Sequence, residues 1–252
     1  MFENYPKVRP PLPVEYREAI NQWYKKNRQG QSPASSLSQR MERWMHYRVA
    51  ADVQQNQAPL TTLEIGAGTL NHLPFEPSPH IYDIIEPFRM FFEQSPWLKQ
   101  IHHIYDDIRE IPSGHQYDRI ISIAVLEHLC DLPEVVARSG LLLTSKGCFR
   151  AAIPSEGTIL WKLGYTCTTG IEFRKRYGLN YDVFMRHEHV NSAQEITDVV
   201  RYFFKSVQRK VFGLHPWLSV YQFFNCASPN IERCQAYLAQ IQGARASTSD
   251  VK

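Results

Sequence analysis

A short apolar run followed at once by a glycine turn constrains this chain more than any other feature. Residues 62–70 read Thr-Leu-Glu-Ile-Gly-Ala-Gly-Thr-Leu. The run 62–65 predicts a buried β-strand, and Gly66, Ala67 and Gly68 predict a turn after it. Glycine there lets the backbone approach a ligand where a Cβ atom would collide. We therefore expect a ligand site at the end of this strand.

A second apolar run, 81–86, ends in an acid, Glu86. Glu86 follows Gly66 by about 20 positions, the spacing at which a carboxylate on the second strand reaches the ribose hydroxyls of a nucleoside ligand. The two runs together predict a nucleoside-containing ligand.

The residues around the turn indicate which nucleoside. A dinucleotide site has a third glycine, which lets a helix N-terminus meet the pyrophosphate, and here that position holds Asn71. Glu64 lies just before the turn, where it could position a cationic amino-acid group, directly or through water. Glu-x-Gly-x-Gly resembles the first motif of the class I S-adenosylmethionine (SAM)-dependent methyltransferases.

The resemblance continues downstream in the order of that superfamily. Tyr-Asp-Asp-Ile at 105–108 resembles the loop that contacts the adenine, with Asp107, or alternatively Asp106, accepting from its exocyclic amine. Residues 117–129 resemble the fourth-strand motif, which ends in Leu-Glu-His-Leu. The resemblance implies SAM as cofactor, held by Glu64, Gly66, Ala67, Gly68, Thr69, Leu70, Glu86, Pro87, Asp107, Ile108, Ala124, Val125 and His128.

The order of elements predicts a Rossmann-like α/β fold with a doubly wound, seven-stranded and mostly parallel sheet. Strands are expected near 60–65, 81–86, 101–105, 118–123 and 148–153, with helices between them, and at 205–214 and 218–224 as an antiparallel closing pair. Ser192 and Glu195 have the spacing of a capping box for a helix to about 204.

Three regions are expected. Residues 1–58 form a proline-containing arm and two helices, near 14–26 and 36–55. Residues 59–228 form the core, including an aromatic insertion at 154–191, after strand five, which in the resembling enzymes forms a lid over the acceptor. Residues 229–252 form a C-terminal helix and tail, expected to be unstructured beyond Gly243. Arg40, Trp44 and His46 of the second helix are candidate pocket residues.

Three histidines are candidate catalytic residues. In an extended segment His187 and His189 would share one face at the end of the lid, where either could be a general base, or merely a hydrogen-bonded surface residue. His128 is expected to line the cofactor cleft or to pack, and Glu127 to form a structural ion pair. The sequence identifies no third ligand for His187 and His189, so no metal is expected.

Composition narrows the class of protein. The chain has 252 residues and a net charge of +3, too small to indicate nucleic-acid binding. The five cysteines are scattered without a Cys-x-x-Cys pair, which is typical of reduced thiols in a cytoplasmic protein and gives no zinc motif. No membrane span and no signal pattern are expected from the apolar runs.

The predicted function is O-methylation of a small-molecule hydroxyl. The layout loosely resembles methyltransferases of bacterial surface-polysaccharide pathways, which implies a saccharide or nucleotide-sugar acceptor. Basic residues at 174–176 and Arg186 would suit an anionic acceptor, or form a solvated face. The alternatives are an NAD(P)-dependent oxidoreductase and a catalytically silent, cofactor-binding partner subunit. The sequence is compatible with an oligomer as well as with a monomer.

Overall fold

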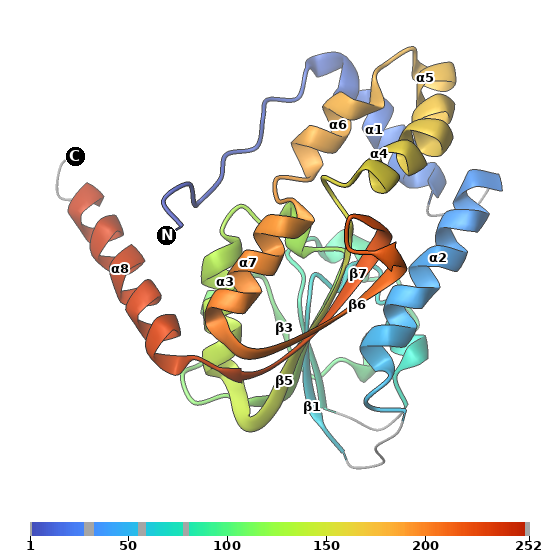
Figure 1. Cartoon of the computed structure of the whole chain (residues 1–252). Helices are drawn as coiled ribbons and strands as arrows, with labels where there is room; N and C mark the ends of the chain where they lie inside the picture. The colour runs from blue at the N-terminus through green and yellow to red at the C-terminus, as the bar shows by residue number, and fades with distance from the viewer. Residues whose placement is uncertain (1, 28–32, 55–58, 78–80, 250–252) are drawn as a thin grey trace.

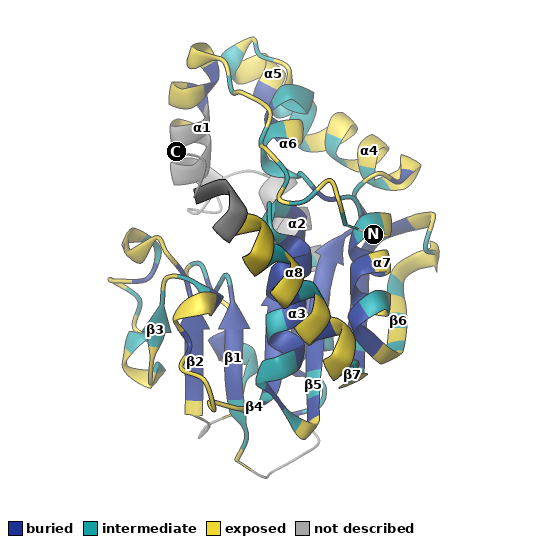
Figure 2. Cartoon of the chain, turned by 90° about the vertical axis from the view of Figure 1, so that its left-hand side faces the viewer, coloured by how far each residue is buried: buried dark blue, intermediate teal, exposed yellow. Residues whose placement is uncertain are grey.

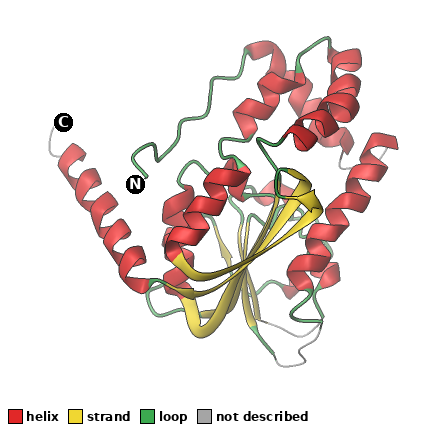
Figure 3. Ribbon diagram, viewed as in Figure 1, coloured by secondary structure: helices red, strands yellow, loops and turns green. Residues whose placement is uncertain are grey.

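The computed structural model describes residues 2–27, 33–54, 59–77 and 81–249, and its centre is one seven-stranded sheet (Figures 1 and 3). The strand order is β3-β2-β1-β4-β5-β7-β6. Pairing is parallel from β3 to β5, and antiparallel between β5 and β7 and between β7 and β6. The predicted mostly parallel sheet with an antiparallel closing pair is confirmed. The strands are β1 (Thr61–Ile65), β2 (Ile81–Ile85), β3 (Ile104–Tyr105), β4 (Tyr117–Ile123), β5 (Leu143–Pro154), β6 (Phe204–His215) and β7 (Leu218–Pro229).

Helices cover both faces of the sheet, and Figure 2 shows its central strands as buried. The helices α3 (Leu132–Leu142), α7 (Ala193–Phe203) and α8 (Ile231–Ser249) lie on one face, and α2 (Pro33–Ala50) lies on the other. Ile120 and Ile121 of β4 are both fully buried but belong to different core clusters, because successive side chains of a strand point to opposite faces. The sheet is therefore a buried middle layer.

The prediction of α-helices between the strands from β1 to β4 is wrong. In the described residues of this region the connections contain only short 3₁₀ turns: η1 (Leu73–Phe75), η2 (Arg89–Phe91), η3 (Leu98–Gln100) and η4 (Ile108–Glu110). Proline lacks the N–H group and clashes with the preceding turn inside a helix. The connections carry Pro74, Pro77, Pro87, Pro96 and Pro112, which explains why no α-helix forms.

A helical lid stands above the carboxyl ends of the parallel strands (Figure 1). It consists of α4 (Ile159–Tyr165), the π-helical turn η6 (Thr166–Gly170), α5 (Ile171–Tyr177) and α6 (Tyr181–Glu188). The first helix, α1 (Val14–Asn27), packs on it: Tyr16 and Ala19 share a buried cluster with Phe173 and Phe184. Helix α1 and the lid thus form one cap.

Two predictions about helix ends have different outcomes. The capping box before α7 is confirmed: the Ser192 hydroxyl accepts from the Glu195 backbone N–H, and the Glu195 carboxylate accepts from the Ser192 backbone N–H. The prediction of an unstructured tail is wrong, because α8 continues through Gly243 to Ser249.

Within the described part of the chain, no helix is long and apolar enough to cross a membrane.

Helix α2 carries His46 away from the lid, into a buried contact with His72. The two Nδ1 atoms are 3.0 Å apart, and the His46 ring also stacks on Phe75. Trp44 packs against Phe212, and the Arg40 side chain lies outside the described residues. Burial, reinforced by the neighbouring His72, lowers the pKa of His46 to about 3.

This pKa predicts a stability loss in mild acid. Below about pH 6.5 the unfolded chain protonates His46 while the folded protein does not, so the stabilisation present above that pH is lost as the pH falls towards 3. Between pH 7.5 and 5.5 the contribution of His46 to the free energy of unfolding should fall by about 1.4 kcal/mol. Urea unfolding of wild type and His46→Phe at both pH values checks this. Equal pH dependence of the two proteins would contradict it.

Candidate functional site

The glycine turn lies at the carboxyl edge of the parallel strands, where open α/β sheets bind ligands. Gly66 has φ +72°, and a Cβ atom there would lie 2.4 Å from Cγ2 of Val125. Gly68 has φ +51°, and no atom lies within 4 Å of the position its Cβ atom would take. Gly66 is therefore required by packing, whereas Gly68 is favoured by its left-handed backbone and borders an open space that a ligand could fill.

Two non-glycine residues beside the turn also have left-handed backbone. Leu70 has φ 62° and Ala124, at the end of β4, has φ 54°. Such conformations cost free energy in residues other than glycine, and they cluster at binding sites. Ala67 and Leu70 are buried in the core, whereas Thr69 is exposed and Ala124 is partly exposed.

The carboxylate of Glu86 is tied to the turn. Its Oε2 atom accepts from the Gly68 N–H at 2.8 Å, and its Oε1 atom accepts from the Phe88 N–H at 3.0 Å. Glu86 is only 5% exposed. Each oxygen of an ionised carboxylate can accept more than one hydrogen bond, so Glu86 retains acceptor capacity for a ligand. Pro87, the next residue, is exposed.

Glu64 is enclosed behind the turn. It is 2% exposed, and its Oε2 atom accepts from the Tyr82 hydroxyl at 2.9 Å. Burial raises the pKa of Glu64 to about 7, against the opposing effects of His72 and the Tyr82 hydrogen bond. Glu64 thus lies next to the expected ligand position but faces a buried polar network.

Asp107 occupies the N-terminus of η4. Its Oδ1 atom accepts from the Arg109 backbone N–H at 2.8 Å, and its Oδ2 atom accepts from Arg109 Nη1 at 2.9 Å. Ile108 is buried in the core beneath it. Both oxygens of Asp107 are therefore already engaged by Arg109, although each could accept a further bond.

A cavity of about 450 Å³ lies between the lid and the carboxyl edge of the sheet. Ala124 lines it, so the cavity adjoins the glycine turn through the end of β4. Helix α2 contributes Glu42 and Met45, and the aromatic members are Trp161, Tyr165, Tyr181 and Tyr221. A larger hollow, about 540 Å³ between the N-terminal arm and α7, shares none of these residues. The smaller cavity is the candidate acceptor site.

Glu127, His128 and His189 meet in this cavity. One carboxylate oxygen and one ring nitrogen from each histidine all lie within 4.8 Å of one another. Nε2 of His128 is 3.8 Å from Oε1 of Glu127, and the two imidazole rings pack edge to face with centroids 4.7 Å apart. Two of the three histidines proposed from sequence are thus brought together.

For Glu127 the sequence predicts a structural ion pair and does not place its carboxylate in the acceptor cavity. Glu127 is 1% exposed, and its Oε2 atom has no hydrogen-bond partner. Burial raises the pKa of Glu127, although His128 and His189 oppose the shift. It lies in the Leu-Glu-His-Leu motif, in which the sequence indicated His128 as the functional residue. No local pattern of residues could show that the Glu127 carboxylate faces the lid.

His187 does not reach the cavity. Helix α6 ends at Glu188 and His189 is its C-cap, so the extended segment expected here is wrong and the two histidines do not share a face. The Nδ1–H group of His187 donates to the Pro10 carbonyl at 2.7 Å. His187 therefore holds the N-terminal arm against the lid.

The basic residues of the insertion also lie elsewhere. Residues 174–176 are exposed on α5, and two of them line a separate shallow depression with Cys167. Arg186 lines a neighbouring hollow. Among the residues that the structure describes, those lining the acceptor cavity include Glu42 and Glu127 but neither lysine nor arginine. The described part of the cavity wall thus supplies no lysine or arginine for an anionic acceptor.

Comparison with known proteins was informative only at the level of structure, since no protein-family model and no curated protein matches the sequence. A SAM-dependent methyltransferase from Thermotoga maritima, described as a possible histamine N-methyltransferase, is 13% identical, with a TM-score of 0.53 over 84% of this chain and 97% of that one. The plantazolicin methyltransferase BpumL, solved with SAH and a monoazolic desmethylPZN analog, is 12% identical, with a TM-score of 0.57 over 84% of this chain and 96% of that one.

A third structure is similar over a larger part of this chain. An O-methyltransferase family protein from Burkholderia thailandensis is 14% identical, with a TM-score of 0.53 over 89% of this chain and 66% of that one. At such identities the similarity concerns the fold. The chain therefore has the Rossmann-like, seven-stranded α/β fold of these SAM-dependent methyltransferases.

Proposed function

We propose that this protein is a SAM-dependent methyltransferase that methylates a hydroxyl group of a small molecule. The observation that carries the proposal is an aromatic-lined cavity that reaches Ala124 at the end of β4; the next residue, Val125, lies against Gly66 of the glycine turn. The methyltransferase descriptions of the similar structures, one of them solved with SAH, support it.

The site fits such a cofactor at two places. Gly68 opens onto free space, and Glu86 lies beside it with remaining acceptor capacity for ribose hydroxyls. SAM would supply the methyl group on its sulfonium. The residues of this chain would align the acceptor for in-line displacement and exclude water, the lid acting from one side and Met45 from the other.

The cavity supports a neutral, polyhydroxylated acceptor such as a saccharide. Trp161, Tyr165 and Tyr181 offer faces on which a sugar ring could pack. The described residues of the cavity wall include no lysine or arginine for the phosphates of a nucleotide-sugar, so we favour the free or glycosidically linked saccharide. The acceptor hydroxyl would lie at Glu127, His128 and His189, because Glu127 and His128 follow Ala124 by three and four positions and His189 lies beside them.

The oxidoreductase alternative lacks its phosphate site. A dinucleotide needs a helix N-terminus after the glycine turn, and the described residues between β1 and β2 form only turns and the 3₁₀ segment η1. Titration calorimetry with SAM and with NAD(P) separates the two hypotheses: tight binding of NAD(P) without SAM binding would refute the proposal. Methyl transfer in a saccharide screen would exclude the silent-subunit alternative.

Glu86 provides a quantitative test of the cofactor site. Glu86→Ala should weaken SAM binding by roughly 1–3 kcal/mol, the usual loss for a charge-assisted hydrogen bond. Glu93→Ala, at an exposed glutamate after the same strand, is the matched control and should bind as wild type does. Calorimetry on both variants checks this, and equal affinities would remove Glu86 from the site.

A further inference from the structure

We propose that Glu127, His128 and His189 form a divalent-cation site in the acceptor cavity. The sequence predicts no metal, because the histidine pair it singles out, His187 and His189, has no third ligand. The tertiary structure pairs His189 with Glu127 and His128 instead, and so supplies two imidazoles and one carboxylate.

The spacing of the three groups suits one ion. Metal–ligand bonds of about 2.0–2.2 Å place two ligands of one ion at most about 4.4 Å apart. The candidate ligand atoms lie within 4.8 Å of one another, so side-chain rotation of the order of 1 Å closes the site.

The backbone holds the two segments in register. The Glu127 carbonyl accepts from the N–H groups of Val190 and Asn191 at 2.9 and 3.0 Å. The Asn191 side chain donates to the carbonyls of Leu126 and Leu129 at 2.9 and 2.7 Å. These bonds clamp the residues after α6 to the Leu-Glu-His-Leu segment, so the ligand positions are preorganised.

Both imidazoles already have the tautomer that a metal ligand needs. The Nδ1–H group of His128 donates to the Glu188 carbonyl at 3.0 Å, and that of His189 donates to Oε2 of Glu156 at 2.8 Å. A carbonyl and a carboxylate can only accept, so each ring, in its neutral form, keeps its lone pair on Nε2. Metal-binding histidines usually have such a partner on the other nitrogen.

The carboxylate supplies an independent observation. Oε2 of Glu127 is buried in the cavity wall and accepts no hydrogen bond. Leaving a buried polar atom without a partner is unfavourable, so such atoms in native proteins usually have a ligand, water or ion beside them. A cation bound by His128 and His189 would satisfy this oxygen.

The ligand types indicate the cation and the acceptor. Two imidazoles with one carboxylate suit Mn²⁺, Fe²⁺, Co²⁺ or Zn²⁺ better than Ca²⁺ or Mg²⁺. The remaining coordination positions would face the cavity and favour an acceptor with two adjacent oxygens, as in a sugar diol; this part rests on the proposed function. Transfer would form the O–CH₃ bond and break the S–CH₃ bond, leaving that electron pair on sulfur and releasing the hydroxyl proton to water.

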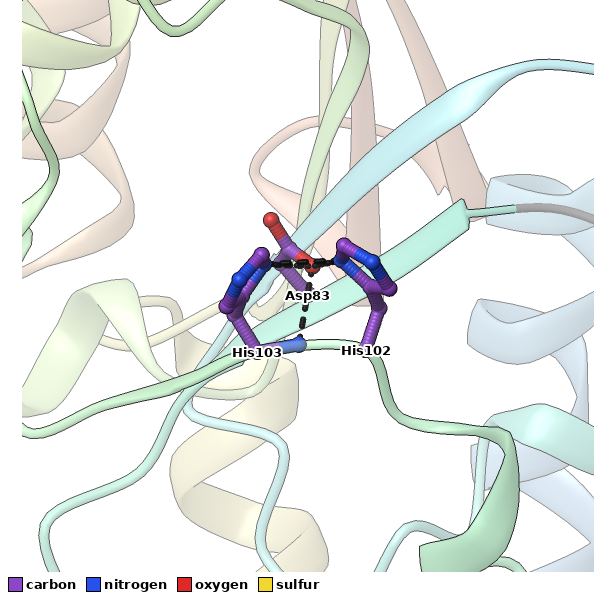
Figure 4. Close-up of side chains that lie close together, drawn as sticks. All are labelled: Asp83, His102 and His103. Atoms are coloured by element: carbon purple, nitrogen blue, oxygen red, sulfur yellow. Dashed lines mark hydrogen bonds and ion pairs between the residues drawn. The ribbon is translucent and has the colours of Figure 1, made fainter.

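A second cluster, shown in Figure 4, must be controlled for. Nδ1 of His102 and Nδ1 of His103 lie 3.5 and 3.4 Å from Oδ1 of Asp83. Both oxygens of Asp83 already accept hydrogen bonds, from the His103 N–H and the Tyr117 hydroxyl, and the two histidine side chains are 57% and 47% exposed. This cluster could bind a cation weakly at the surface, so the test removes it.

The experiment is calorimetric titration of Mn²⁺ and Zn²⁺ into the His102→Ala/His103→Ala double variant. We expect one cation per chain. Adding Glu127→Gln, which keeps the side-chain volume, should weaken binding by at least 100-fold, since loss of an outer-shell partner alone typically costs about 10–100-fold. Adding His187→Ala, the matched control, should leave the affinity unchanged. No binding in the double variant, or binding that Glu127→Gln leaves intact, overturns the proposal.

Two further measurements keep the outcomes separate. Co²⁺ added to the double variant should produce the visible absorption bands of a nitrogen-ligated ion. This measurement needs no further substitution, and the absence of such bands overturns the proposal. SAM affinity is measured on the same samples. Cation binding without SAM binding refutes the proposed function alone, and SAM binding without cation binding refutes the cation site alone.

Discussion

Gly68→Val should abolish SAM binding while the protein stays folded. The valine side chain would occupy the space that lies open beside the turn, and the left-handed backbone at φ +51° is unfavourable for a β-branched residue. Gly114→Val is the matched control: Gly114 also has a positive φ, +100°, and open space around it, but it lies in the loop before β4. Calorimetry and thermal unfolding are the measurements.

The neighbouring glycine should behave differently. At Gly66 a valine would collide with the Val125 side chain, so we expect Gly66→Val to lower the unfolding temperature as well as SAM affinity. Wild-type SAM affinity in a folded Gly68→Val protein would remove the cofactor from this turn. Loss of affinity in Gly114→Val to the same degree would show that the effect is not local.

His189→Ala should lower turnover by roughly 10²–10⁴-fold, the range typical for loss of a group that assists proton removal. We expect this effect whether the imidazole takes the proton itself or holds a cation that acidifies the hydroxyl. SAM affinity should stay near wild type, because His189 comes from the lid and not from the glycine turn. Turnover on the true acceptor and SAM calorimetry test both parts.

His187→Ala is the control for this variant. His187 lies two positions away, but its imidazole donates to Pro10 outside the cavity, so turnover should be close to wild type. Near wild-type turnover in His189→Ala would show that the cluster is not catalytic and that alignment alone drives transfer. An equal loss in both variants would instead indicate that the lid is disturbed as a whole.

The acceptor cavity shows why fold similarity alone does not identify a substrate. The structures that share this fold carry descriptions as different as a possible histamine N-methyltransferase and a plantazolicin methyltransferase. The sheet and the glycine turn lie below the lid, whereas the cavity wall comes largely from α2 and the lid helices. Substitutions in the wall, such as Trp161 and Glu42, are therefore the means to change acceptor preference.

The sequence by itself determined the sheet, the glycine turn, the position of Glu86 and the capping box at Ser192. Each depends on spacing within one short segment: alternate burial along a strand, two glycines around one residue, or a serine three positions before a glutamate. The prolines between β1 and β4 are an equally local signal, and they disfavour helices there. Their effect explains why the helices expected from strand–helix alternation do not form.

Only the tertiary structure decided which polar groups meet. His128 and His189 are far apart in the chain. Their segments are held together by hydrogen bonds from the Asn191 side chain to the carbonyls of Leu126 and Leu129, which lie 65 and 62 positions earlier. The end of α6 at Glu188 turned His187 towards Pro10 and left His189 at the cavity. Such contacts depend on where a helix ends and how the lid packs. Both are decided by small free-energy differences between whole conformations, which a short pattern of residues does not encode.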